Sequence, residues 1–246
     1  MRCAWPETMN IAMWSGPRNL STAMMYAFAA RGDCAVWDEP FYAAYLAATG
    51  LSHPMQDAVI AAGETAPIRV ADACSRAPAG GEKLFYQKHM TMHMIPEFPL
   101  DFMAMCRNVF LIRHPARVVS SYARKREGPT LLDLGFVQQA ALFDREADRL
   151  GHAPLVIDSA DIRANPRESL MKICVALGIP FADAMLSWPP GPKPHDGAWA
   201  PHWYGAVHRS TGFEAAEGEL PDLPTEYQHL ADRGLQAYHR LREHTL

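Results

Sequence analysis

The sequence has few cysteines and no long apolar run. Its five cysteines are scattered singly along 246 residues, so neither a disulfide framework nor the paired spacing of a metal site is present. No apolar stretch approaches the ~18 residues of a membrane span, and residues 1–10 lack the apolar region of a signal peptide. These absences predict a cytoplasmic protein without a membrane span.

An excess of one charge sign is also missing. The net charge of −4 and the isoelectric point near 6.2 argue against a general nucleic-acid binder, because such proteins carry a large basic face. A local basic pocket for a small anionic ligand remains compatible with this balance. The length and the hydrophobic content of 49% suit a single α/β domain over residues 1–246.

The N-terminal region predicts a strand, a glycine turn and a helix. The apolar run Ile11–Trp14 is typical of a buried strand, Ser15–Pro17 of a turn, and the Ala- and Met-rich run that follows contains no helix breaker. Arg18, Ser21 and Thr22 stand at the junction. Free N–H groups at a helix start, the positive end of the helix dipole and an arginine together predict a phosphate site.

This loop departs from the Walker pattern of ATPases, which has a second glycine followed by a lysine. Ser21 takes the position of that glycine, no lysine is adjacent, and the cation is Arg18. The residues predicted to form the loop are Gly16, Pro17, Arg18, Asn19, Leu20, Ser21 and Thr22. The alternative interpretation is a buried strand–helix turn without a ligand.

Apolar runs and helical patterns alternate along the rest of the chain. Strands are predicted at 34–37, 84–89, 108–113 and 155–157, and helices at 42–49, 116–125, 131–150, 166–177 and 223–244. Helix fragments and loop are expected over 53–81, and an ordered loop that covers the site over 188–213. The alternation predicts a three-layer α/β/α fold with a mainly parallel sheet, like that of P-loop nucleotide hydrolases, with 108–113 as its central strand.

A second cationic position follows the strand at 108–113. Arg113 ends this strand, and Ser121 comes eight residues later on the next predicted helix. Arginine offers phosphate a planar pair of donors, and serine adds one more. Two phosphate sites on neighbouring strand–helix units indicate a nucleotide with two separate phosphate groups.

These motifs resemble the sulfotransferases that use 3′-phosphoadenosine 5′-phosphosulfate (PAPS). The family's phosphosulfate loop, Pro-Lys/Arg-Ser-Gly-Thr-Thr, is similar to Pro17–Thr22 in its proline, cation and two hydroxyls, with Asn19–Leu20 in place of Ser-Gly. The family's Arg-x-Pro turn with a serine eight residues after the arginine matches Arg113–Pro115 and Ser121. Residues 158–180 resemble its segment ending in Leu-Gly-Ile-Pro.

The resemblance implies a sulfotransferase that moves a sulfuryl group from PAPS, its co-substrate, to a hydroxyl or amine of a small-molecule acceptor. Arg18, Ser21 and Thr22 would hold the 5′-phosphosulfate, and Arg113 and Ser121 the 3′-phosphate. Because arginine and backbone N–H groups can neutralise the leaving phosphate, no metal is expected. A P-loop kinase of a small metabolite and a non-catalytic nucleotide-binding protein are the alternatives.

Two residues compete for the role of general base. Glu39 follows the strand at 34–37, where many bacterial relatives place a glutamate. His89, directly after Lys88, is similar to the Lys-x-His element of cytosolic sulfotransferases at a spacing one residue tighter. Position favours Glu39, with His89 or Lys88 assisting the leaving group or orienting the acceptor. A helix-capping carboxylate and a hydrogen-bonded core histidine are the respective alternatives.

Three further groups carry weaker expectations. Residues 124–126 are expected to be a solvated helix end. Residues 199 and 202–204 (Trp199, His202, Trp203 and Tyr204) either cover the adenine or acceptor or pack within their own loop. His89 and His93, four residues apart, lack a third ligand, so no metal site is predicted.

Overall fold

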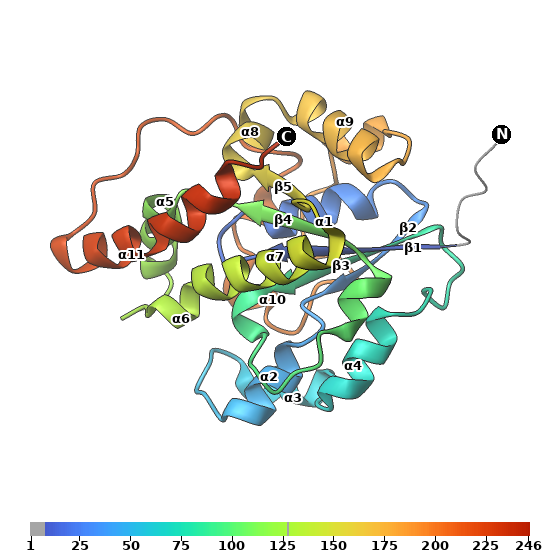
Figure 1. Cartoon of the computed structure of the whole chain (residues 1–246), viewed down its shortest axis with the longest axis horizontal. Helices are drawn as coiled ribbons and strands as arrows, with labels where there is room; N and C mark the ends of the chain where they lie inside the picture. Colours follow the sequence, from blue (N-terminus) through green and yellow to red (C-terminus); the bar gives the residue numbers. More distant parts are fainter. Residues whose placement is uncertain (1–7, 127) are drawn as a thin grey trace.

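The computed structural model describes residues 8–126 and 128–246, so Cys3 and most of the segment considered for a signal peptide lie outside it. Five strands form one sheet in the order β2-β3-β1-β4-β5, and every neighbouring pair is parallel (Figure 1). The strands are β1 (Met9–Ser15), β2 (Cys34–Asp38), β3 (Leu84–Met90), β4 (Arg107–Ile112) and β5 (Leu155–Asp158). Their carboxyl ends therefore meet at one edge of the sheet, where such folds bind ligands.

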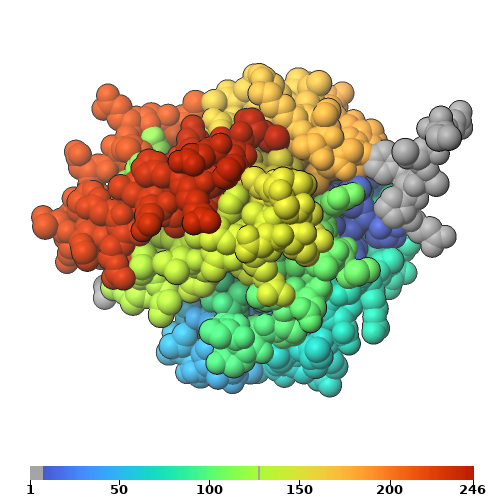
Figure 2. All heavy atoms as spheres, in the orientation of Figure 1, coloured from blue at the N-terminus to red at the C-terminus, as the bar shows by residue number. Residues whose placement is uncertain are grey.

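Side chains of β1 alternate between two hydrophobic layers because successive strand residues point to opposite faces. Ile11 and Met13 pack on one face of the sheet, and Ala12 and Trp14 pack on the other. The first face is covered by α1 (Ser21–Ala29), α8 (Ser159–Ala164) and α9 (Pro166–Leu177), and the second by α2 (Tyr42–Thr49), α3 (Gln56–Ala62), α4 (Pro67–Cys74), α7 (Phe136–Leu150) and α11 (Thr225–Arg242). Figure 2 shows α7 and α11 side by side on the surface. The predicted three-layer α/β/α fold with a parallel sheet is confirmed.

Several predicted bounds agree with the structure, and two expectations are wrong. The helices at 42–49 and 166–177 are confirmed at both ends, and 53–81 contains helix fragments as predicted. The central strand is β1 rather than β4, which lies between β1 and β5. The single helix predicted at 131–150 is also wrong, because α6 (Leu131–Leu134) ends before α7 begins.

Gly135 separates these two helices. Its φ of 67° is a left-handed conformation that glycine adopts without steric cost. A Cβ at this position would lie 2.4 Å from Thr91 Oγ1, whose hydroxyl donates to the Gly135 carbonyl oxygen at 3.0 Å. The break therefore lets the chain approach the end of β3 closely.

The remaining elements are short. The 188–213 segment contains α10 (Ala200–Trp203) and a 3₁₀ turn at Val207–Arg209. The other 3₁₀ turns are Thr91–His93, Asp101–Met105 and Asp183–Leu186, and α5 spans Pro115–Ala123. Among the helices of residues 8–126 and 128–246, none combines the length and apolar character needed to cross a bilayer. The four described cysteines are buried free thiols.

Candidate functional site

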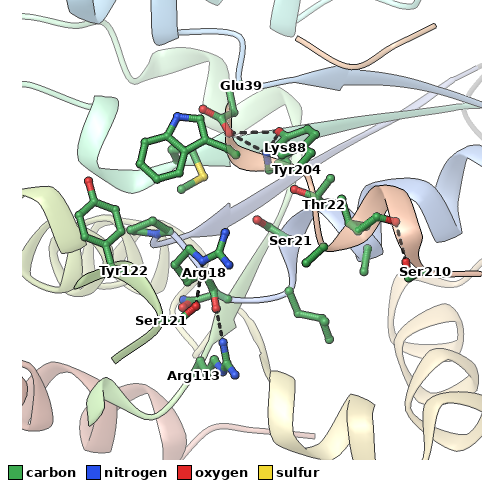
Figure 3. A pocket seen from close by; sticks show the side chains of 18 of the residues that line it. Arg18, Ser21, Thr22, Glu39, Lys88, Arg113, Ser121, Tyr122, Tyr204 and Ser210 are labelled. Atoms are coloured by element: carbon green, nitrogen blue, oxygen red, sulfur yellow. Dashed lines mark hydrogen bonds and ion pairs between the residues drawn. The ribbon is translucent and has the colours of Figure 1, made fainter. Parts of the chain in front are cut away.

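A cleft of about 410 Å³ lies at the carboxyl edge of the sheet (Figure 3). Its walls include the residues 17–23 after β1, Glu39 directly after β2, Lys88 near the end of β3 and Arg113 directly after β4. Four neighbouring strands thus deliver polar side chains to one cavity. This is the location at which open parallel sheets place ligands.

The loop between β1 and α1 is held in a strained conformation. Arg18 and Leu20 have φ angles of 63° and 71°, which cost a non-glycine residue about 1–3 kcal/mol each. Two contacts fix the loop: Asn19 Nδ2 donates to the Leu111 carbonyl oxygen at 3.3 Å, and Arg113 Nη1 donates to the Arg18 carbonyl oxygen at 2.6 Å. Leu20 thus adopts a left-handed conformation at the position where the related loop has a glycine.

The start of α1 is free to bind an anion. Leu20 precedes the helix and contributes no side-chain cap, and Ser21 and Thr22 line the cleft in its first turn (Figure 3). Uncapped N–H groups and the helix dipole favour a negatively charged ligand there. Glycine is required at position 16 because of close packing: a Cβ there would lie 2.6 Å from the Leu134 carbonyl oxygen.

The two predicted phosphate sites share one cleft. Arg18 Nε donates to Ser121 Oγ of α5 at 3.0 Å, and Arg113 contacts the backbone of Arg18. Burial lowers the pKa of Arg18, and the charges of Arg113 and Arg124 lower it further. Arg124, expected in a solvated helix end, is exposed but also lines the cleft. This concentration of positive charge is suited to an anionic ligand.

A buried ion cluster lies on the opposite side of the cleft. Lys88 Nζ donates to Asp38 Oδ1 at 2.8 Å and to Glu39 Oε1 at 2.6 Å. It also donates to the Tyr204 hydroxyl oxygen at 2.5 Å, and that hydroxyl lies 2.7 Å from Asp38 Oδ2. In Figure 3 Glu39, Lys88 and Tyr204 lie together, with Ser21 between them and Arg18. The cleft therefore has a carboxylate side and an arginine side.

Burial has opposite effects on the pKa values of Glu39 and Lys88 in this cluster. Burial raises the pKa of Glu39, although the charge of Lys88 partly offsets the effect. Burial alone would lower the pKa of Lys88, but Asp38 and Glu39 outweigh it and keep that pKa above its usual value. Lys88 thus remains a protonated cation, and Glu39 is a carboxyl whose proton affinity is raised by burial.

The structure places His89 in the core rather than at the cleft. Because β3 side chains alternate, His89 faces the opposite side of the sheet from Lys88. Its ring stacks on Trp14 with centroids 4.4 Å apart, and its Nε2 lies 3.1 Å from Gln87 Oε1. The residue is 1% exposed, and burial lowers its pKa to about 3. His89 is therefore a neutral histidine of the hydrophobic core.

His93, whose spacing from His89 suggests only an incomplete metal site, is a cleft residue. It follows β3 in a 3₁₀ turn and lines the cleft, with Nε2 4.0 Å from Glu39 Oε2. Its ring stacks on Tyr42 with centroids 4.4 Å apart, and burial lowers its pKa well below the usual value. No sequence pattern indicated this role, because a turn after a strand reorients side chains in a way that spacing does not reveal.

Aromatic and methionine side chains complete the wall beside Glu39. Tyr122 of α5 stacks on Trp203 of α10 with centroids 5.9 Å apart, and Met90 and Met92 lie at the same cavity. Trp203 and Tyr204 thus reach the cleft from the 188–213 segment, whereas the buried Trp199 donates Nε1–H to the Tyr204 hydroxyl oxygen at 3.0 Å. The segment both packs on itself and lines the site.

The family model described as a sulfotransferase domain matches residues 9–243 of the chain. Two Arabidopsis thaliana proteins, branched-chain-amino-acid aminotransferase-like proteins 1 and 2, are 36% identical over 241 residues and 34% identical over 234. These alignments cover 98% and 95% of this chain but only 42% and 41% of the relatives. The chain thus spans about two fifths of their length, and their names describe the longer proteins.

Two solved structures also match at low similarity. The sulfotransferase domain of the Synechococcus PCC 7002 olefin synthase has a TM-score of 0.48 at 19% identity, with 95% of this chain and 98% of that chain covered. The sulfotransferase domain from the curacin biosynthetic pathway has a TM-score of 0.47 at 16% identity, with 92% and 97% covered. Neither likeness is close enough to carry an argument. Since the family match extends over nearly the whole chain, however, the protein belongs to the sulfotransferase domain family.

Proposed function

We propose that the protein transfers a sulfuryl group from PAPS to a hydroxyl or amine of a small acceptor. The observation that carries the proposal is the two-sided cleft: Arg18, Arg113 and the start of α1 lie on one side, and the Glu39–Lys88 pair lies on the other. The positively charged side suits an anionic donor, and the side with the carboxylate suits an acceptor that must lose a proton. Both reactants would then lie next to each other in one cleft.

The arginine side suits a nucleotide with phosphates at both its 3′ and 5′ positions. Ser21, Thr22 and the uncapped N–H groups of α1 would hold the 5′-phosphosulfate with Arg18. Arg113 and Ser121 would hold the 3′-phosphate. Among the residues that the structure describes, the buried Nε of Arg113 has no hydrogen-bond partner, so it retains a donor for a ligand oxygen.

Glu39 is the proposed general base. Its raised pKa suits it to accept the proton that the acceptor loses as the new S–O bond forms. Lys88, held between Asp38 and Glu39, keeps the base ionised and in place. His89 has no such role in this proposal, because it is buried on the other face of the sheet.

The wall beside Glu39 supports an acceptor with an apolar part. Tyr42, Met92, Tyr122 and Trp203 line the same cleft as Glu39, and its buried cation Lys88 is already paired with two carboxylates. Burying an apolar group there is favourable, whereas an additional carboxylate of the acceptor would approach Glu39 without a free partner.

Ligand-induced thermal stabilisation tests the proposal. Adenosine 3′,5′-bisphosphate at one hundred times its Kd should raise the Tm by about 5–11 °C without Mg²⁺, because it binds only the folded state. Arg113→Ala should remove this shift and retain the smaller one given by adenosine 5′-monophosphate. Arg107→Ala, an exposed arginine at the start of β4, is the matched control.

The alternatives predict different patterns. A kinase would be stabilised by ATP together with Mg²⁺ and would ignore the bisphosphate. A non-catalytic nucleotide-binding protein would bind the bisphosphate but show no sulfuryl transfer to any acceptor. An unchanged shift in Arg113→Ala would contradict the assignment of the 3′-phosphate site.

A further inference from the structure

Three arginines converge on one carboxylate beside the cleft. Arg113 hydrogen-bonds Glu217 Oε1 through Nη2, and Arg163 of α8 lies 3.1 Å from the same oxygen. Arg117 of α5 lies 3.2 Å from Oε2. The Glu217 side chain is only 4% exposed. Two neighbouring strand–helix units, β4–α5 and β5–α8, thus bind a single acidic side chain.

That side chain comes from an otherwise exposed segment. Residues 214–220 contain neither helix nor strand, and all of them except Glu217 are exposed. The segment is held through the arginines: Arg163 Nε donates to the Ala215 carbonyl oxygen at 2.9 Å, and Arg117 donates to the Gly218 carbonyl oxygen. Because no buried apolar residue anchors this segment, it can leave without opening the hydrophobic core.

The charges in this cluster are not balanced. Arg163 also pairs with Glu214 at 3.1 Å, so three guanidinium groups face two carboxylates. A phosphate monoester carries up to two negative charges and three acceptor oxygens, and arginine binds such groups with paired hydrogen bonds. Exchanging the Glu217 carboxylate for a phosphate would neutralise the cluster.

The cluster is continuous with the proposed nucleotide site. Arg113, Arg163 and Glu214 line the cleft, and Arg113 also holds the backbone of Arg18. We propose that Arg113, Arg117 and Arg163 form a phosphate monoester site that Glu217 fills in the free protein. A ligand phosphate displaces the Glu217 carboxylate, so the 214–220 segment acts as an internal competitor. That this phosphate belongs to the sulfuryl donor rests on the proposed function.

The test compares the intact chain with Glu217→Gln, Glu217→Ala and Arg163→Gln, with Glu219→Gln as an exposed control in the same segment. Isothermal titration with adenosine 3′,5′-bisphosphate should give a Kd about tenfold lower for both Glu217 variants, because the competing carboxylate is gone. Arg163→Gln should raise the Kd about tenfold. Adenosine 5′-monophosphate, which lacks the 3′-phosphate, should bind all variants equally.

A weaker or unchanged affinity in both Glu217 variants would overturn the proposal, since Glu217 would then organise the arginines rather than compete with the ligand. Urea unfolding of each variant identifies a loss of affinity that comes from a loss of folded protein. An equal effect of Arg163→Gln on both nucleotides would likewise contradict a phosphate-specific role.

Inorganic phosphate separates this inference from the proposed function. Phosphate should raise the Tm of Glu217→Gln more than that of the intact chain, and the double variant Glu217→Gln/Arg163→Gln should lose this gain. If phosphate has these effects on the Tm while the bisphosphate binds no variant, the phosphate site at the arginines is supported and the assignment of PAPS as the donor is wrong. If phosphate stabilises all variants equally, the arginine site itself is refuted.

Discussion

Replacing Lys88 by methionine should remove the cation that holds two buried carboxylates together. Its ammonium group lies 2.8 Å from Asp38 Oδ1 and 2.6 Å from Glu39 Oε1, and the side chains of Lys88 and Asp38 are each 2% exposed. Removing one partner of a buried ion pair costs about 3–5 kcal/mol, since the remaining charge stays buried and unpaired. For a chain of this size the Tm should therefore fall by about 6–20 °C.

The loss should depend on pH in a definite direction. The pKa of Glu39 is already raised by burial, and without Lys88 it rises further. A carboxyl whose pKa is higher in the folded state than in the unfolded state stabilises the fold at low pH and loses that contribution as the pH rises. The Tm deficit should thus be larger at about pH 8 than at about pH 5.5.

Thermal unfolding followed by circular dichroism measures this deficit. Lys83→Met is the matched control, because Lys83 is exposed just before β3 and should change the Tm little. A Lys88→Met deficit as small as that of the control would refute the buried ion cluster. A large deficit that stays constant between the two pH values would show that lost packing, rather than unpaired charge, causes it.

Three further predictions follow from the site and the fold. Glu39→Gln should lower sulfuryl-transfer turnover by about 10²–10⁴-fold and leave the bisphosphate-induced Tm shift intact; loss of that shift would indicate a structural role. Gly135→Ala should lower the free energy of unfolding in urea by more than Gly151→Ala, since both have positive φ but only Gly135 lies against Thr91; equal losses would contradict the close approach. His89→Phe should retain sulfuryl-transfer turnover. It should also reduce the decrease in the free energy of unfolding below about pH 6.5, because a buried histidine with a pKa of about 3 binds a proton in the unfolded state before it does so in the folded state. A turnover loss like that of Glu39→Gln would restore His89 as the base.

Local chemistry explains why several elements could be predicted closely. The helix α9 begins at Pro166, after an Asn165 side chain that accepts the Glu168 N–H at 3.3 Å, and ends before Gly178 at φ 71°. All of these signals lie within a few residues of the helix they delimit. The predicted phosphate loop and the Arg113–Ser121 spacing are local in the same sense, so their pattern is visible in the sequence.

The wrong helix prediction has a tertiary cause. Residues 131–150 carry a helical pattern, but Gly135 must pass within contact of Thr91, and Leu134 lies against Gly16 of the loop between β1 and α1. These neighbours are far away in the sequence. Because of these long-range contacts, residues 131–150 form two helices rather than one continuous helix.

The sequence by itself determined the parallel α/β fold, the strand–loop–helix unit at residues 9–29 and the arginine after β4, because each depends on residues close together in the chain. The tertiary structure decided which side chains meet. Because successive side chains of β3 point to opposite faces, Lys88 lies at the cleft and His89 lies in the core. The register of β2 and β3 places Asp38 beside Lys88. Folding also brought Glu217 to two arginines of the β4–α5 unit and to one of α8. Such meetings depend on side-chain direction and strand register, which arise only when distant segments pack together.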